Sequence, residues 1–160
     1  MTNASARPKS REWLWIACAV LVIATMHWRV MIGASVYVHD DLAREVLPTH
    51  GFAAGELAQG RLTPWCGLVG CGYPFWANCQ SGTFYAPNLF FAGGLPLSVS
   101  LGWLLWLHYS LAAIGTCVLA RRLGCSPSGG FVAGVVFAGS GFMAAHLIHY
   151  SIVCAAAFLP

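Results

Sequence analysis

Long apolar stretches alternate with shorter polar segments along this chain. A helix needs about 20 apolar residues to cross the hydrocarbon core of a bilayer, and three stretches reach that length, at 13–33, 97–120 and 129–147. A fourth apolar stretch, 150–160, is too short to cross as a helix. The pattern predicts an all-α, polytopic helical membrane protein, and we expect this chain to be the amino-terminal fragment of a larger one.

The segment between the first two apolar stretches, 34–96, has a different pattern. Apolar residues recur at helical spacing through 42–58, but Pro48 and Gly51 interrupt them, which predicts two short amphipathic helices. The following segment, 61–88, is too aromatic for a flexible linker and too rich in Pro and Gly for a helix. Because amphipathic helices and aromatic side chains favour the headgroup level, we expect a subdomain that rests on the bilayer.

Composition supports the same class. Charged residues make up 8% of the chain and hydrophobic residues 58%, with a mean hydropathy of +0.69. Soluble domains average about 25% charged residues, so this chain has too little polar surface to cover itself in water. A lipid bilayer is therefore its expected partner, and the lack of an exposed basic patch excludes nucleic acid.

The basic residues predict the orientation, because short loops rich in Lys and Arg stay on the cytoplasmic side. Arg7, Lys9 and Arg11 precede the first span, and Arg121 and Arg122 follow the second. We expect a protein of the cell membrane with a cytoplasmic tail (1–12), a first span (13–33), an extracytoplasmic loop subdomain (34–96), a second span (97–120), a cytoplasmic turn (121–128), a third span (129–147) and the start of a fourth (150–160).

A cleaved signal peptide is the alternative for the first span, since a basic start followed by an apolar core is its pattern. The apolar stretch is long for a signal peptide and contains no clear small-x-small cleavage site, although Gly33, Ala34 and Ser35 are small. The sequence therefore favours an uncleaved helix.

Three of the seven cysteines, Cys66, Cys71 and Cys79, lie in the predicted outer loop. An oxidising compartment would let two of them pair and leave one free, or none is paired. Their spacing does not match a structural zinc site. The other four are expected to be packing residues or inert thiols: Cys18, Cys117, Cys125 and Cys154.

Two further features concern helix packing. His108 lies within the second span, where a hydrogen bond to another helix is its expected role. Small residues at helical spacing let membrane helices approach closely, and six glycines in and before the third span predict such packing: Gly124, Gly129, Gly130, Gly134, Gly139 and Gly141.

Six short motifs follow the acidic pair Asp40 and Asp41 in order. They are GRLTPW at 60–65, GYPFWANCQS at 72–81, FYAPN at 84–88, LHYSLAA at 107–113, ARRLG at 120–124 and FAGSGF at 137–142. Their order and spacing resemble those of the bacterial YfhO-type membrane proteins, over nearly the whole chain from Asp41 onward. One departure lies after Trp65, where Cys66 and Gly67 stand in place of the Asn and Pro that the family often has.

The YfhO-type family is similar to the GT-C glycosyltransferases, which transfer a sugar from a polyprenyl-phosphate lipid on the outer face of the membrane. The resemblance implies a GT-C-like helical enzyme with an extracytoplasmic cell-envelope acceptor and an essential acidic residue in the first external loop. The distance to Pro48 fits the family pattern better from Asp41 than from Asp40. Asp41 is therefore the predicted catalytic residue.

The chemistry of such a transfer suits these residues. The acceptor hydroxyl must lose a proton as it attacks the anomeric carbon, and a carboxylate such as Asp41 can act as general base. The phosphate leaving group needs a cation. The candidates are Arg44, Arg61, His50 and a divalent metal held by Asp40 and Asp41. On the residues alone, Asp40 is equally explained as a helix cap, with Asp41 stabilising the first turn.

Four more residues complete the predicted substrate-binding set. Trp65 and Tyr85 belong to the aromatic loop, where they would meet a lipid with a polar head. His146 and His149 are three residues apart near the outer end of the third span. They could contact phosphate or anchor the helix at the interface.

A transporter or flippase of a lipid-linked substrate is the alternative function. A transporter should carry charged or helix-breaking residues near the middle of its spans, whereas the acidic residues of this chain gather in the predicted external loop. This distribution favours the enzyme, although we expect the fragment alone to be inactive.

Overall fold

The computed structural model describes residues 12–37 and 40–160, and most of them are helical. Three helices are long and apolar enough to cross a membrane, as predicted. They are α1 (Glu12–Met31), α3 (Leu97–Arg122) and a third that runs over Pro127–Ile148. The predicted basic tail, with Arg7, Lys9 and Arg11, lies outside the described residues.

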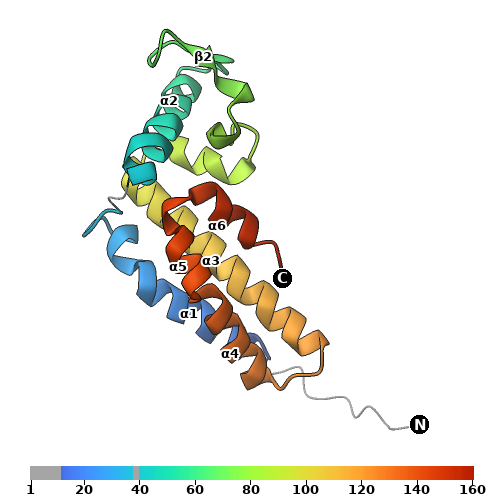
Figure 1. Cartoon of the computed structure of the whole chain (residues 1–160). Helices are drawn as coiled ribbons and strands as arrows, with labels where there is room; N and C mark the ends of the chain where they lie inside the picture. Colours follow the sequence, from blue (N-terminus) through green and yellow to red (C-terminus); the bar gives the residue numbers. More distant parts are fainter. Residues whose placement is uncertain (1–11, 38–39) are drawn as a thin grey trace.

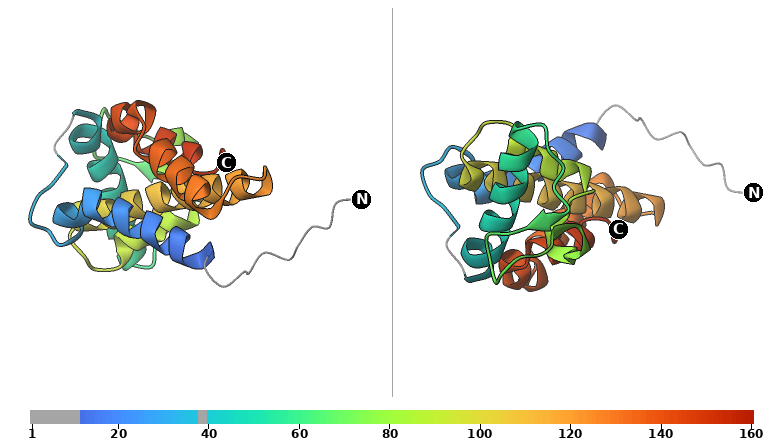
Figure 2. Two further views of the ribbon diagram at one scale, coloured as in Figure 1. Left: turned by 90° about the horizontal axis from the view of Figure 1, so that it is seen from below. Right: turned by 90° about the horizontal axis from the view of Figure 1, so that it is seen from above.

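The long helix α3 is the centre of a three-helix bundle and packs against both α1 and α4 (Pro127–Ala138) (Figure 1 and Figure 2). Glycines allow both close approaches. A Cβ atom on Gly102 would lie 2.7 Å from Cγ1 of Val30 in α1, and one on Gly134 would lie 2.5 Å from the carbonyl oxygen of Ala113 in α3. Of the six glycines predicted to permit close packing, Gly130 and Gly134 do so against α3.

The third predicted span is not one uninterrupted helix. The chain leaves α4 at Gly139, and Ser140 adopts an extended conformation before the short helix α5 (Gly141–Ala145). The Ser140 hydroxyl accepts a hydrogen bond from the backbone N–H of Met143, so it caps the new helix. A 3-10 turn, η6 (His146–Ile148), and the helix α6 (Tyr150–Ala156) follow.

The segment between the first two spans forms a separate layer at one end of the bundle (Figure 1). It begins with a π-helical turn, η2 (Leu42–Val46), that continues directly into α2 (Leu47–Ala58). The predicted division at Pro48 and Gly51 is therefore wrong. Pro48 directly follows the π-helical turn, whose hydrogen bonds span five residues instead of four, and the helical segment continues past the N–H that proline lacks.

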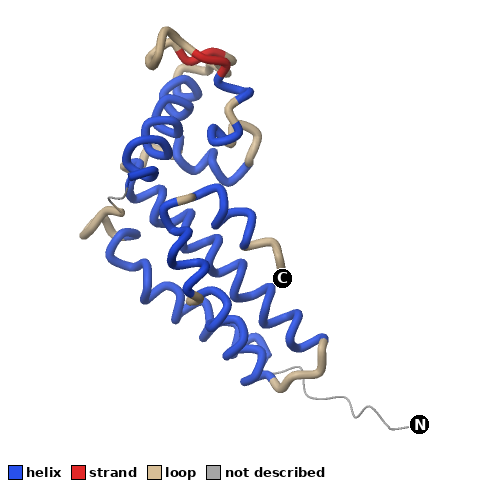
Figure 3. Tube along the Cα trace, in the orientation of Figure 1, coloured by secondary structure: helices blue, strands red, loops and turns tan. Residues whose placement is uncertain are grey.

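The rest of this outer layer is a short hairpin and a series of 3-10 turns. The strands β1 (Trp65–Cys66) and β2 (Tyr73–Pro74) pair antiparallel, with Trp65 opposite Pro74, at the end of the layer farthest from the bundle (Figure 3). The 3-10 turns are η3 (Phe75–Ala77), η4 (Cys79–Ser81) and η5 (Ala86–Ala92). All seven cysteines are free thiols, so none of the three in the predicted outer loop is paired.

The opposite end of the bundle brings the start of α1 to the end of α3. Glu12 forms an ion pair with Arg121 there, and Arg121 also donates a hydrogen bond to the carbonyl oxygen of Cys125. Glu12 and the turn that follows α3, both predicted to be cytoplasmic, therefore lie at the same end of the bundle, and the outer layer borders the other. Which end faces the cytoplasm stays a prediction.

Candidate functional site

The outer layer and the third span meet at a contact between Asp41 and His149. Asp41 has helical backbone angles and directly precedes η2, and its Oδ2 lies 3.3 Å from Nε2 of His149. Both side chains are close to half exposed, at 46% and 40%. The structure therefore holds the predicted catalytic carboxylate beside one of the predicted phosphate-contacting histidines, within reach of solvent.

Asp40 has a different partner. Its carboxylate lies 3.4 Å from the guanidinium of Arg44, one turn further along, and both side chains are exposed. Exposed pairs of this kind contribute less than about 1 kcal/mol, so Arg44 is held only weakly. Within residues 12–37 and 40–160, no group of three or more His, Cys, Asp or Glu side chains is placed to hold a metal ion.

A cavity of about 280 Å³ lies between the outer layer and α6. Within the described part of the chain, the residues that line it carry no charge; some are polar and the others are apolar. Those with functional groups are His50, Cys79, Gln80, Tyr85, Asn88, Tyr150, Ser151 and Cys154. Tyr150, which lines the cavity, directly follows His149 in the chain.

His50 is buried at the edge of this cavity, with 2% of its surface exposed. Its ring stacks on Phe91 at 4.5 Å between centroids and meets the ring of Tyr150 edge-on. Burial lowers the pKa of His50 to about 4, so the ring is neutral near pH 7. His50 is therefore placed for hydrogen bonding rather than for the cationic role that the sequence suggested.

Two tyrosine hydroxyls join the outer layer to the spans. The Tyr85 hydroxyl lies 2.6 Å from Nε2 of His108, whose Nδ1 lies 2.6 Å from the carbonyl oxygen of Leu104. A carbonyl oxygen only accepts, so Nδ1 carries the proton and, in the neutral ring, Nε2 accepts from Tyr85. The sequence predicted a bond from His108 to another span, whereas the structure shows a bond to the outer layer.

The second connection is the hydroxyl of Tyr150, which donates to Oδ1 of Asn88 at 2.9 Å. The amide of Asn88 in turn donates to the carbonyl oxygen of Gly82 at 3.0 Å. Sequence reasoning did not select Asn88 or Tyr150 as site residues. Asn88 ends the FYAPN motif, which was the available signal, whereas Tyr150 reaches the site only through the tertiary fold.

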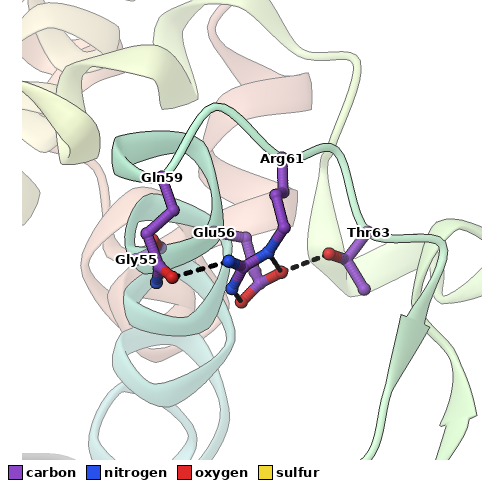
Figure 4. Close-up of polar contacts among 5 residues, drawn as sticks. All are labelled: Gly55, Glu56, Gln59, Arg61 and Thr63. Atoms are coloured by element: carbon purple, nitrogen blue, oxygen red, sulfur yellow. Dashed lines mark hydrogen bonds and ion pairs between the residues drawn. The ribbon is translucent and has the colours of Figure 1, made fainter.

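Arg61 and Trp65 lie away from this site. Arg61 forms a two-point ion pair with Glu56 near the end of α2, with Nε–Oε2 and Nη2–Oε1 distances of 3.0 and 2.7 Å (Figure 4). Hydrogen bonds from Arg61 and Thr63 lower the pKa of Glu56 to about 2. Trp65 lies in the hairpin. The structure does not bring either residue to Asp41, which stands at the other end of the helical segment.

His146 lies close to His149, with 5.7 Å between ring centroids. Its ring also packs on Phe142 at 4.3 Å, and its Nδ1 lies 2.9 Å from the carbonyl oxygen of Phe142. The two predicted phosphate-contacting histidines are therefore neighbours, and His149 is the one in contact with Asp41.

No family model, curated protein or solved structure matches this chain. The resemblance to the YfhO-type proteins accordingly stays a prediction, and the candidate site rests on the contacts described above.

Proposed function

We propose that this protein takes part in the transfer of a sugar from a polyprenyl-phosphate lipid to an extracytoplasmic cell-envelope acceptor, in the manner of a GT-C-type glycosyltransferase. Asp41 is the general base of this reaction. The observation that supports it is the contact between Asp41 and His149, which holds a partly exposed carboxylate where the outer layer meets the third span.

In this proposal, Asp41 removes the proton of the acceptor hydroxyl as its oxygen attacks the anomeric carbon of the sugar. General-base catalysis of this kind contributes roughly 10²–10⁴-fold to a rate. The imidazole of His149 positions the carboxylate and stabilises its charge. Asp41 is better suited than Asp40 to this role, because Asp40 is directed to the exposed guanidinium of Arg44.

The cavity between the outer layer and α6 is the proposed place for the sugar. A sugar ring presents both C–H and O–H groups, and the lining offers aromatic rings together with amide and hydroxyl groups, such as those of Tyr85, Asn88 and Tyr150. Its volume of about 280 Å³ is close to the lower end of the usual range for small-molecule sites. An uncharged lining suits the sugar better than the phosphate.

The phosphate leaving group would then meet a cation outside the cavity. Arg44 is the candidate that the geometry favours, because its guanidinium is exposed and loosely paired one turn from Asp41. Arg61 is less suited to meet the phosphate, because its guanidinium already donates two hydrogen bonds to Glu56. His146 and His149 add two imidazole groups on the other side of the same contact.

The test is Asp41→Asn in the gene that encodes this protein, with Asp40→Asn as the matched control. Membranes containing each variant are given a panel of labelled polyprenyl-phosphate sugars, and loss of sugar from the donor lipid is measured. We expect Asp41→Asn to lower the rate about 100-fold or more and Asp40→Asn to keep most of it.

Undiminished transfer by a correctly folded Asp41→Asn protein would remove Asp41 from the mechanism. A wild-type protein that moves the labelled lipid across the membrane without releasing its sugar would instead support the transporter or flippase.

A further inference from the structure

A second cavity, of about 340 Å³, lies at the end of the bundle opposite to the candidate site. It is enclosed by the start of α1, the end of α3 and the start of α4. Because α1, α3 and the span that begins with α4 (Pro127–Ile148) are long and apolar enough to cross a bilayer, their ends mark the level of the lipid headgroups. The cavity therefore faces the region where headgroup and acyl chain meet.

The polar side of this cavity carries a net positive charge. Its charged lining residues are Arg121, Arg122 and Glu12, two cations and one anion. Glu12 is paired with Arg121, whereas Arg122 forms no ion pair with any residue in the described part of the chain. The Nε atom of Arg121 is buried there and has no hydrogen-bond partner among the described residues.

The other side of the cavity is apolar. Trp15 and Phe131 form one wall, with ring centroids 5.6 Å apart, and Ile16 and Val118 extend it toward the middle of the bundle. Tryptophan is enriched at the membrane interface, where its ring suits both glycerol and upper acyl carbons. The cavity thus combines a basic side at the membrane surface with an apolar side toward the hydrocarbon core.

We propose that this cavity binds one anionic phospholipid from the leaflet at that end of the bundle. The phosphate meets the guanidinium of Arg122, and the upper acyl chain lies along Trp15 and Phe131. Basic pockets between membrane helices recognise anionic headgroups in this way. Arg122 provides selectivity over zwitterionic lipids, because Glu12 already neutralises Arg121.

Purified protein in neutral detergent tests the proposal. Phosphatidylglycerol or phosphatidylcholine is added, and bound lipid is counted by native mass spectrometry while thermal unfolding is followed in parallel. We expect phosphatidylglycerol to bind and to raise the Tm, and phosphatidylcholine to do neither. Removing one basic residue near the surface should weaken phosphatidylglycerol binding about fivefold. We expect this loss for Arg122→Gln, whereas Arg122→Lys keeps the charge and should bind as the wild type does.

Arg29→Gln is the matched control, since it removes an exposed arginine in the last turn of α1, at the other end of the bundle. It should bind phosphatidylglycerol as the wild type does. Equal binding of the two lipids, or unchanged binding by Arg122→Gln, would overturn the proposal. A Tm increase with inorganic phosphate alone equal to that with phosphatidylglycerol would also overturn it, by showing that the site takes the free anion rather than the lipid.

Discussion

His50 shows what burial does to a single ionisable side chain in this protein. Its pKa is about 4 in the folded chain, against about 6.5 when it is exposed. Between these values the unfolded chain binds a proton that the folded chain does not, so stability is lost as the pH falls from 6.5 toward 4. We expect His50 alone to cost about 2 kcal/mol of stability between pH 7 and pH 5.

His50→Phe should remove this loss, because phenylalanine keeps the stacking on Phe91 and carries no titrating group. Thermal unfolding in detergent at pH 7 and pH 5 measures it. The same comparison between pH 8 and pH 9, where His50 is neutral in the folded and the unfolded chain, is the control, and the wild type and the variant should respond alike there. A His50→Phe protein as acid-sensitive as the wild type would contradict the assignment.

The acidic pair shows how far the sequence predicts the candidate site. Spacing to Pro48 favours Asp41 over Asp40 only through the resemblance to the YfhO-type pattern, which stays a prediction. The structure gives the two carboxylates different partners. The pairing of Asp41 with His149 was not predicted, because the two residues are distant in sequence. A contact that depends on how the outer layer packs on the bundle cannot be predicted from a local sequence pattern.

At the scale of elements, the packing of α4 on α3 depends on Gly134. A Cβ atom there would lie 2.5 Å from both the Ala113 carbonyl oxygen and Sγ of Cys117. We expect Gly134→Ala to destabilise the protein by about 1–3 kcal/mol, measured as a lower Tm in detergent. Gly55→Ala in α2 is the matched control, since nothing lies within 4 Å of the place its added methyl group would take. It should be neutral or slightly stabilising, and equal effects of the two substitutions would contradict this packing.

Helix existence was easier to predict than helix boundaries. The three spans follow from the length of their apolar stretches, which the bilayer thickness constrains. The break at Ser140 was missed because a serine in an apolar segment resembles a small packing residue, although its hydroxyl can equally cap a helix. At Pro48 the error was the reverse, since a proline taken as a break lies within a continuous helical segment, directly after a π-helical turn.

At the scale of the whole molecule, the two ends of the bundle differ in chemistry. One carries the ion pair of Glu12 and Arg121 with the free charge of Arg122. The other carries the outer layer, with Asp41 and His149 at the junction. The positive-inside tendency predicts that the arginine end is cytoplasmic, and this orientation is required if Asp41 acts on an extracytoplasmic acceptor.

The native cysteines allow this orientation to be measured without introducing new residues. Cys71 and Cys79 are exposed thiols of the outer layer, and Cys125 is an exposed thiol at the opposite end. A membrane-impermeant maleimide should label Cys71 and Cys79 in sealed right-side-out vesicles and Cys125 only in inverted ones. Cys18 within α1 should stay unlabelled in both, because the reagent does not enter the hydrocarbon core of the bilayer. Cys125→Ser, as control, should abolish labelling of inverted vesicles alone. Labelling of Cys125 from the outside would reverse the predicted topology, and with it the placement of Asp41 on the extracytoplasmic face.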